Sequence, residues 1–321
     1  MVVYAVPLRN RFRGITVREG VLLHGPAGWG EFCPFADYSD AESVPWLAAA
    51  VEATELGWPR PVRDRVPVNT TVPVVPPERA HDLVAASGCR TAKVKVADPQ
   101  SCLMDDCERV AAVRAALGPG GAVRVDANMA WDTDTAVRAI RELDRAAGGL
   151  EYVEQPCPSV AELAAVRRRV DVRIAADESI RRAEDPLRVA VAGAADVAVI
   201  KVSPLGGVRR ALEVAEACGL PCVVSSAVET SVGLAAGLAL AGALPSLDFA
   251  CGLGTMSLLT GDVTSHSLSP VDGYLPVPRS APEPDLAGTV AADDQTTLVW
   301  KERLARVRSW YYRAGSTSVR R

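Results

Sequence analysis

The stretch TAKVKV at residues 91–96 is a short apolar run that carries two lysines, and it predicts a buried β-strand. Because side chains alternate between the two faces of a strand, Lys93 and Lys95 point to the same side. Two like charges buried next to each other are costly unless anions or a metal-bound ligand share the space. The alternative is an edge strand whose lysines block aggregation. The sequence downstream of this stretch decides between the two.

From residue 67 onward, strand-like and helix-like segments alternate. Eight segments are predicted as strands: 68–75, 91–96, 123–128, 150–155, 173–178, 197–203, 222–226 and 247–251. The segments between them repeat apolar residues at helical spacing, and several are followed by a helix-ending glycine. This alternation predicts an α/β fold of the (β/α)8 TIM-barrel type over residues 68–270. A dinucleotide-binding or P-loop fold is disfavoured, because neither glycine-rich motif follows the first strand.

The two ends of the chain lack this alternation and predict a second domain. Strands are expected at 2–6 and 14–23, joined by a turn that carries the arginines at 9, 11 and 13. A glycine- and proline-rich loop follows from residue 25, and then a helix at 40–54. Beyond residue 270, we expect a strand at 296–300 and a helix at 302–312. Residues 1–67 and 271–321 are therefore predicted to form an α+β capping domain that covers the barrel.

Composition and charge narrow the possible partners. The chain has 321 residues, of which 49% are hydrophobic, and a net charge of −4, so it has no basic excess for nucleic acid. The longest apolar run, 232–247, is rich in small residues and interrupted by Pro245, which argues against a membrane span. Eight irregularly spaced cysteines without a secretion signal predict a cytoplasmic protein with buried thiols. The oligomeric state stays open, and a monomer is compatible with the sequence.

Charged side chains end five consecutive predicted strands of the barrel. They are Lys93 and Lys95; Arg124, Asp126 and Asn128; Glu154; Asp177 and Glu178; and Lys201. In a TIM barrel, chemistry takes place at the C-terminal ends of the strands. Three carboxylates, Asp126, Glu154 and Asp177, come from adjacent strands and converge on one sector, where such hard oxygen ligands suit Mg²⁺, or Mn²⁺ in its place.

The lysines complete this constellation. Strands two and six lie opposite each other in a ring of eight, so Lys95 and Lys201 are expected to flank a substrate held over the metal. This arrangement suits removal of a proton next to a carboxylate of a small-molecule substrate. Lys95 needs a lowered pKa to act as a base, and the neighbouring Lys93 lowers it.

Five further residues are candidate substrate contacts, each with a structural alternative. Arg124 either contacts a substrate carboxylate or pairs with an acid of the barrel, and Asn128 either bonds near the metal or ends its strand. Ser225 and Ser226 either donate to a carboxylate or cap a helix. Gly252 lies where the eighth strand leads into its loop. Glu178 points away from the predicted ligand Asp177 and is assigned a supporting role.

These residues resemble the motifs of the enolase superfamily, in the muconate lactonising subgroup: Lys93-Val-Lys95, Asp126-Ala-Asn128, Glu154-Gln155-Pro156, Asp177-Glu178-Ser179 and Lys201. Enolase-superfamily sites use a lysine or histidine base together with Mg²⁺. The chain is most similar to the o-succinylbenzoate synthases of the short actinobacterial type, through 124–128, 200–207, 225–231 and the N-terminal Arg13-Gly14 and 28–35. This resemblance implies a lyase of menaquinone biosynthesis in which Lys95 removes the proton and Lys201 stabilises the opposite face.

Other activities of the same superfamily remain open. An N-acylamino acid racemase or dipeptide epimerase uses both lysines as bases, but a dipeptide epimerase of this kind has an Asp-x-Asp on its eighth strand, where this chain has Gly252-Leu253-Gly254. Muconate cycloisomerase is a further alternative. A barrel that only binds a ligand is disfavoured, because all five core residues are present.

Overall fold

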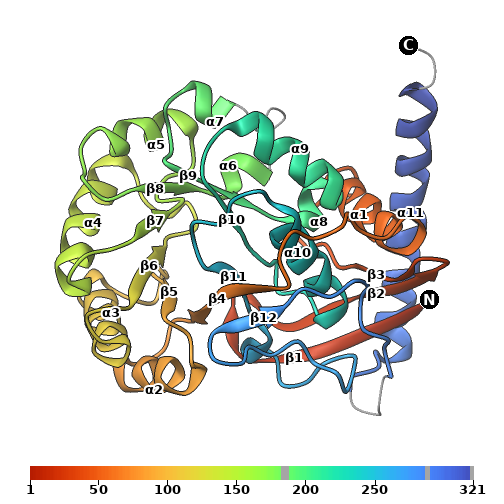
Figure 1. Cartoon of the computed structure of the whole chain (residues 1–321), viewed down its shortest axis with the longest axis horizontal. Helices are drawn as coiled ribbons and strands as arrows, with labels where there is room; N and C mark the ends of the chain where they lie inside the picture. The colour runs from red at the N-terminus through yellow and green to blue at the C-terminus, as the bar shows by residue number, and fades with distance from the viewer. Residues whose placement is uncertain (182–187, 286–289, 319–321) are drawn as a thin grey trace.

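The computed structural model describes residues 1–181, 188–285 and 290–318 and contains a barrel with a smaller sheet beside it (Figure 1). The smaller sheet is antiparallel, in the order β1 (Val2–Phe12), β2 (Ile15–Gly25) and β3 (Gly28–Phe32). The predicted turn around the N-terminal arginines is short. β1 continues to Phe12, and Arg13 and Gly14 turn the chain with positive φ angles of 50° and 81°.

The larger sheet confirms the predicted barrel. Its strands pair in parallel in the order β10-β9-β8-β7-β6-β5-β4-β11, and a parallel bridge between Ser225 and Gly252 joins the two ends. The strands are β4 (Arg65–Val72), β5 (Thr91–Lys95), β6 (Ala122–Asp126), β7 (Tyr152–Glu154), β8 (Ile174–Ala176), β9 (Val197–Ile200), β10 (Cys222–Val224) and β11 (Cys251–Gly254). Most are shorter than predicted: Lys95, Asp126 and Glu154 are the last residues of their strands, whereas Asp177 and Lys201 directly follow theirs.

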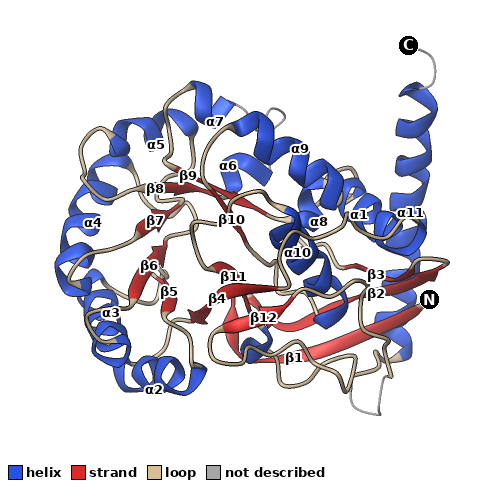
Figure 2. Cartoon of the chain, in the orientation of Figure 1, coloured by secondary structure: helices blue, strands red, loops and turns tan. Residues whose placement is uncertain are grey.

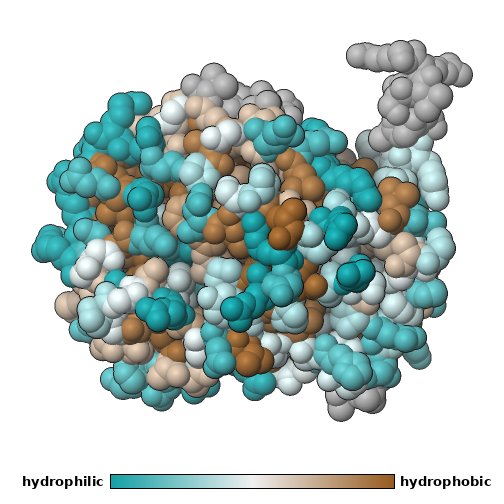
Figure 3. All heavy atoms as spheres, viewed as in Figure 1, coloured by the Kyte–Doolittle hydropathy of each residue, from teal (hydrophilic) through white to brown (hydrophobic). Residues whose placement is uncertain are grey.

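Helices surround the strands on the outside (Figure 2). They are α2 (Pro77–Ser87), α3 (Leu103–Leu117), α4 (Thr133–Ala147), α5 (Val160–Arg167), α6 (Glu178–Arg181), α7 (Arg188–Val191), α8 (Val202–Leu205), α9 (Val208–Cys218) and α10 (Ser231–Ala243). The outer rim is largely hydrophilic (Figure 3), as expected for amphipathic helices whose apolar stripes face the strands. Within the described ranges, no helix combines the length and the apolar character that crossing a membrane requires.

The capping domain is completed by α1 (Val44–Glu55) and by the C-terminal helix α11 (Asp294–Ser318). The predicted strand at 296–300 is wrong, because these residues form the first turns of α11. Trp300, Leu304 and Val307 are buried at helical spacing, and this packing outweighs the strand preference of the preceding β-branched residues. The end of α11 extends away from the rest of the molecule (Figure 1).

Two polar contacts fix the cap against the barrel. Glu52 of α1 accepts hydrogen bonds from the backbone N–H groups of Val208 and Arg209, the first residues of α9. Glu31 of β3 accepts from the backbone N–H groups of Thr230 and Gly233 at the start of α10, at 3.1 and 2.8 Å. Both carboxylates lie at helix N-termini, where the unpaired N–H groups and the helix dipole favour an anion.

The predicted domain boundaries at residues 67 and 270 stay predictions. β4 begins at Arg65, and β12 (Tyr274–Pro276) pairs antiparallel with β4 rather than with the sheet of the cap. All eight cysteines are free thiols, and five of them are buried as predicted. Cys102, at the start of α3, is exposed, so the prediction of a buried thiol is wrong there.

Candidate active site

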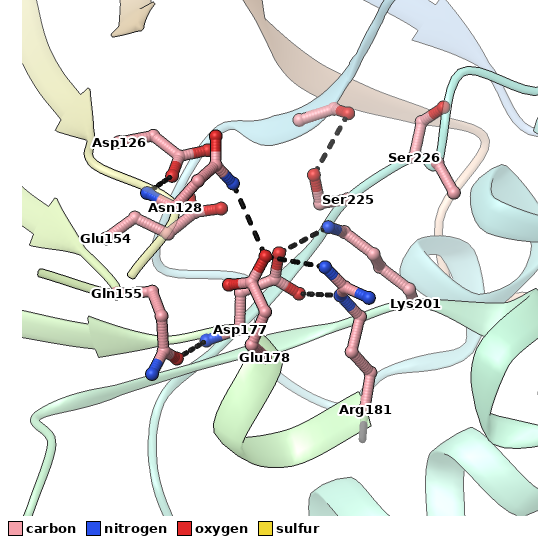
Figure 4. A network of polar contacts seen from close by, with 12 residues as sticks. Asp126, Asn128, Glu154, Gln155, Asp177, Glu178, Arg181, Lys201, Ser225 and Ser226 are labelled. Atoms are coloured by element: carbon pink, nitrogen blue, oxygen red, sulfur yellow. Dashed lines mark hydrogen bonds and ion pairs between the residues drawn. The ribbon is translucent and has the colours of Figure 1, made fainter. Parts of the chain in front are cut away.

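Side chains from neighbouring strands of the barrel meet at the C-terminal ends of β5 to β9. Figure 4 shows Asp126, Glu154 and Asp177 turned toward one another, with Lys201 reaching them from the far side. The strand register explains the convergence: Lys95 pairs with Asp126, and Asp126 with Glu154, across parallel neighbours. Equivalent strand ends therefore lie at the same height in the barrel, as the sequence predicted.

Lys95 lies between two oxygen atoms of the third barrel strand. Its Nζ donates to Asp126 Oδ2 at 2.5 Å and to Asn128 Oδ1 at 2.6 Å. The backbone N–H of Asn128 in turn donates to Asp126 Oδ1 at 3.0 Å, and the left-handed φ of 45° at Asn128 makes this return possible. Asn128 thus acts through Lys95 and Asp126 and not merely as the end of a strand.

Lys93 occupies a deeper position on the same face of β5. Its Nζ donates to both carboxylate oxygens of Glu154 at 2.9 Å and lies 3.5 Å from Asp126 Oδ2. The lysines of TAKVKV therefore point inward to two different carboxylates, and the alternative of an aggregation-blocking edge strand is excluded because β5 has a neighbour on each side.

On the opposite side, Lys201 Nζ donates to Asp177 Oδ2 at 2.5 Å. Arg181, one helical turn after Asp177, donates to Asp177 Oδ1 at 3.0 Å and to Glu178 Oε1 at 2.6 Å, and also contacts the hydroxyl of Tyr38 from the cap. Our sequence interpretation missed Arg181 and Tyr38. The i, i+4 spacing from Asp177 is a signal for Arg181, whereas nothing in the sequence places Tyr38 here.

Burial and neighbouring charges shift the pKa values of these groups. Burial lowers the pKa of Lys95, and Lys93 lowers it further, which together outweigh the opposing effect of Asp126. Burial also works to lower the pKa of Lys93, but the carboxylates of Glu154 and Asp126 more than compensate and hold this pKa above its usual range. Of the two lysines, Lys95 is therefore the better suited to act as a base.

The carboxylates respond in opposite directions. Burial works to raise the pKa of Asp126 and of Asp177, but Lys95 for the former and Arg181 for the latter hold each pKa below its usual range. Burial and the neighbouring Asp126 carboxylate raise the pKa of Glu154 to about 7, despite its contact with Lys93. Burial and repulsion between the carboxylates thus act mainly on Glu154, which of the three is the easiest to protonate.

The donor chemistry of this region fits a divalent cation. Three buried carboxylates supply hard oxygen ligands, and Glu178 Oε2 is buried without a hydrogen-bond partner in the described part of the chain. In the described residues, no three acidic, histidine or cysteine side chains are arranged to hold a metal ion, because lysines and an arginine occupy the carboxylates. Metal binding therefore requires these ion pairs to give way.

A cavity of about 40 Å³ adjoins the lysines and carboxylates. The cap closes it with Phe12, Arg13 and Phe35, and the Phe12 ring centroid lies 5.2 Å from Lys95 Nζ. Wider grooves lie on the outside of the molecule, including one of about 880 Å³ beside Trp58, but they contain none of the active-site lysines. Chemistry rather than volume identifies the site.

Four of the five candidate substrate contacts line this cavity: Asn128, Ser225, Ser226 and Gly252. A side chain at Gly252 would place Cβ 2.5 Å from Ser225 Oγ, so glycine is required for the serine hydroxyl to fit. Arg124 is different: it is fully buried inside the barrel, with Nε 2.5 Å from Glu151 Oε2 and Nη1 2.7 Å from the Ala250 carbonyl. Of the two alternatives for Arg124, the structure therefore favours the ion pair with an acid of the barrel.

Comparisons with known proteins identify the family to which the chain belongs. Residues 77–282 match the model of the enolase C-terminal domain-like family, and residues 3–54 that of the enolase N-terminal domain-like family. The o-succinylbenzoate synthase of Thermobifida fusca is 63% identical over 306 residues, which cover 95% of each chain. That of Mycolicibacterium smegmatis is 53% identical, over 94% of this chain and 93% of the relative.

Solved structures show the same fold. The L-Ala-D/L-Glu epimerase of Bacillus subtilis matches with a TM-score of 0.73 and 26% identity, over 91% of this chain and 98% of its own. The muconate lactonizing enzyme of Pseudomonas fluorescens matches with a TM-score of 0.73 and 23% identity, over 93% and 97%. With near-complete coverage and 63% identity to a curated relative, this chain belongs to the enolase superfamily and, within it, to the o-succinylbenzoate synthase family.

Proposed function

We propose that this chain catalyses the syn elimination of water from 2-succinyl-6-hydroxy-2,4-cyclohexadiene-1-carboxylate, which gives o-succinylbenzoate for menaquinone biosynthesis. The observation that carries the proposal is the pair of lysines at the barrel mouth, Lys95 and Lys201, each hydrogen-bonded to a carboxylate at the end of the neighbouring strand. The enzyme is a hydro-lyase of a metal-dependent superfamily. Its eight free thiols support a cytoplasmic location.

Lys95 is the proposed base. In its neutral form, Nζ takes the proton from the ring carbon that bears the carboxylate, and the electron pair of that C–H bond moves toward the carboxylate. The hydroxyl on the next ring carbon then departs with its bonding electrons and takes a proton from Lys95, so that water leaves and the ring becomes aromatic. Since the elimination is syn, one amine on one face of the ring serves both proton transfers.

Lys201 and Lys93 support this step by their charge. Lys201 comes from the opposite side of the barrel and presents a cation to the other face of the substrate, where it stabilises the negative charge that develops. Lys93 adds a second cation beside Lys95. A divalent cation, for which we propose Mg²⁺, would be held by Asp126, Glu154 and Asp177 and would stabilise the charge that builds up on the substrate carboxylate.

The charge balance of the site supports a doubly charged substrate. Four cationic side chains contact four anionic ones: Lys93, Lys95, Lys201 and Arg181 against Asp126, Glu154, Asp177 and Glu178. Adding a divalent cation alone would leave an excess of positive charge in a buried region, which is costly. A substrate with two carboxylates offsets the two charges of the metal ion as long as Lys95 is still protonated. This substrate carries two, one on the ring and one on the succinyl chain.

Substrate binding requires the cap to move. The cavity of about 40 Å³ has room for a few water molecules, each of which needs about 10–15 Å³, but not for a substrate of this size. Phe12 and Arg13, at the tip of the β1–β2 hairpin, close it: the Phe12 ring lies beside Lys95, and the Arg13 guanidinium lies over the Phe35 ring. We therefore propose that this tip withdraws to admit the substrate and returns to exclude water.

Turnover of the purified chain tests the proposal directly. With Mg²⁺ present, the cyclohexadiene substrate is expected to be converted to o-succinylbenzoate, followed by the change in ultraviolet absorbance upon aromatisation. Absence of turnover in a folded, metal-loaded sample would refute the proposal.

A racemase or epimerase is the second candidate, because a relative of this fold at 26% identity is an L-Ala-D/L-Glu epimerase and because both lysines are present. Two bases on opposite faces would exchange the α-proton of an amino-acid substrate in both enantiomers. Incubation of N-acylamino acids and dipeptides in D₂O separates the two: deuterium in both enantiomers supports the epimerase. Gly252-Leu253-Gly254 on β11 supplies no acidic side chain for a dipeptide amine, which favours the lyase.

A further inference from the structure

The loop that follows β10, residues 225–229, has a strained backbone beside the active-site cavity. Ser225, Ser226, Ala227 and Val228 all line the cavity. Val228 is 3% exposed and has a φ of 63°, in the left-handed region that a β-branched residue rarely adopts. Such a conformation persists only where surrounding contacts hold it in place. The contacts of the 225–229 loop therefore show which residues hold this wall of the cavity in its conformation.

Contacts within the loop close its turn. The Val228 N–H donates to Ser226 Oγ at 2.8 Å, and Ser226 Oγ donates to Glu229 Oε2 at 2.7 Å. Glu229 Oε2 also accepts from the Ala227 N–H at 2.6 Å, and its Oε1 accepts from Ser203 Oγ at 3.0 Å. These bonds orient the serine hydroxyl and the N–H groups. None of these bonds involves the carbonyl of Val228. That carbonyl, whose direction follows from the backbone conformation of Val228, has its partner outside the loop.

That partner comes from the middle of β2 in the cap. Arg18, which is 2% exposed, donates from Nε to the Val228 carbonyl at 3.0 Å and from Nη2 to the Cys33 carbonyl at 2.5 Å. Its guanidinium lies 4.4 Å from the centroid of the Phe35 ring. Phe35 lines the same cavity, so one side chain connects a wall of the site in the barrel to a wall in the cap.

Burying a charged arginine is expensive unless its charge is offset and its donors are bonded. The nearby carboxylates of Glu229 and Glu31 favour the charge. Its hydrogen bonds go to two backbone carbonyls, and both carbonyls belong to segments that border the cavity. A planar guanidinium holds two acceptors at a fixed separation, which a flexible amine cannot do. The geometry therefore matches a device that sets the relative position of the 225–229 loop and the 33–35 segment.

We propose that Arg18 is a positioning residue for substrate binding: it holds Val228 in its left-handed conformation and thereby aligns Ser225, Ser226 and Phe35 around the substrate. This inference rests on the proposed function, because it assigns the aligned wall to that substrate. Arg18 does not touch the reacting atoms, so its loss affects substrate affinity more than the chemical step.

Arg18→Lys, which keeps the charge but removes the fork, tests the proposal in the full-length, Mg²⁺-loaded enzyme. We expect the KM for the substrate and the Kd for the product o-succinylbenzoate, measured by calorimetry, to rise together by about tenfold, and kcat to change much less. Arg63→Lys is the matched control. Arg63 also donates to backbone carbonyls, those of Ala241 and Leu244, but at the opposite end of α10. It is expected to lower Tm without changing KM or Kd.

A second substitution isolates the strain. Glycine adopts a φ near +60° at no steric cost, so Val228→Gly lessens the need for the Arg18 bond. The rise in KM caused by Arg18→Lys should therefore be several-fold smaller in the Val228→Gly background than in the wild type. If Arg18→Lys does not fold alone, the proposal requires Val228→Gly to restore folded protein.

Three outcomes would overturn the proposal. They are a KM and Kd within twofold of wild type in folded Arg18→Lys, effects of the two substitutions that simply add, and a failure of Val228→Gly to rescue a misfolded single variant. A failure of the proposed function itself looks different, because the wild-type enzyme would then neither turn over the substrate nor bind o-succinylbenzoate.

Discussion

Lys95 donates a hydrogen bond to Asp126, with Nζ 2.5 Å from Oδ2, so the proposed base rests directly on a proposed metal ligand. A cation that draws the Asp126 carboxylate toward itself removes the bond that keeps Lys95 charged. Binding of a divalent cation by Asp126 would in this way also free Lys95 to act as the base. Without the metal, Lys95 is therefore expected to stay paired with Asp126 and to be unable to act as a base.

Replacement of Lys95 by alanine is expected to reduce kcat by at least about a thousandfold, since it removes the group that transfers both protons. The fold is expected to survive, because the Lys95 side chain is partly accessible and Asp126 keeps Lys93 as a partner. Ultraviolet absorbance measures turnover, and circular dichroism checks the fold. A folded variant with more than a tenth of wild-type kcat would refute the role of Lys95 as the base.

Lys201→Ala should also abolish turnover, but through loss of a stabilising cation and not of a base, with a fall of about a hundredfold or more in kcat. Lys201→Arg keeps the charge and distinguishes the two roles. If Lys201 stabilises charge, the arginine variant retains more activity than the alanine variant. Equal loss in both variants would indicate that proton transfer by Lys201 is required, as in the epimerase alternative.

Asp177→Asn is expected to raise the Mg²⁺ concentration needed for half-maximal activity by about tenfold or more, because a charged ligand becomes neutral. In the wild type, Mg²⁺ at a hundredfold excess over its Kd should stabilise the fold by about 2.7 kcal/mol, and this rise in Tm should largely vanish in the variant. Asp132→Asn is the matched control, since it caps α4 and asparagine caps equally well. An unchanged metal titration would remove Asp177 from the ligand set.

Glu52→Ala tests the contact between the cap and the barrel. Its carboxylate is largely buried and accepts from two N–H groups at the start of α9 and from the Arg209 guanidinium at 2.8 Å. Leaving these donors unpaired is expected to lower the free energy of unfolding by about 1–3 kcal/mol, measured by urea denaturation. Glu216→Ala, at an exposed position on α9, serves as control. Equal effects of both substitutions would contradict the importance of this contact.

The thiols differ in reactivity in a predictable way. Burial raises the pKa of Cys251 and, together with neighbouring groups, those of Cys157 and Cys222, each to about 12. Because the thiolate is the reactive form, these thiols stay protonated at pH 8 and react appreciably only as the pH approaches 12. Exposed Cys102 should therefore react first with a disulfide reagent in the native protein. Loss of the fast phase in Cys102→Ser would confirm the assignment, and its persistence would contradict it.

The sequence was sufficient to predict the barrel and the positions of its charged strand ends. Residues such as Lys93, Lys95 and Asp126 have their direction set by strand alternation and by parallel register, which are local properties that a sequence carries. Arg124 shares this alternation but lies deeper along its strand. Its partner, Glu151, directly precedes the neighbouring strand β7, and only the folded sheet brings the two together. Depth within a barrel is a property of the assembled sheet.

The contribution of the cap was beyond sequence reasoning for a related reason. Tyr38 and Phe35 reach the site because the loop that carries them folds back over the barrel, and no periodicity encodes that path. The residues 296–300 illustrate the opposite problem, since their β-branched side chains favour a strand. Tertiary burial of Trp300 on the sheet and its hydrogen bond to Glu19, at 2.9 Å, instead favour a helix.

Contacts made by helix α11 affect when, during its synthesis, the enzyme can become active. Arg303 donates to the carbonyls of Pro34, Phe35 and Tyr38, which places the cap residues that close the site. The first forty residues to leave the ribosome thus acquire their final arrangement only after residue 303 has emerged. Barrel strands can pair during synthesis, because domains fold as the chain appears. A nascent chain that holds every lysine and carboxylate of the site is therefore expected to remain inactive until its last helix is made.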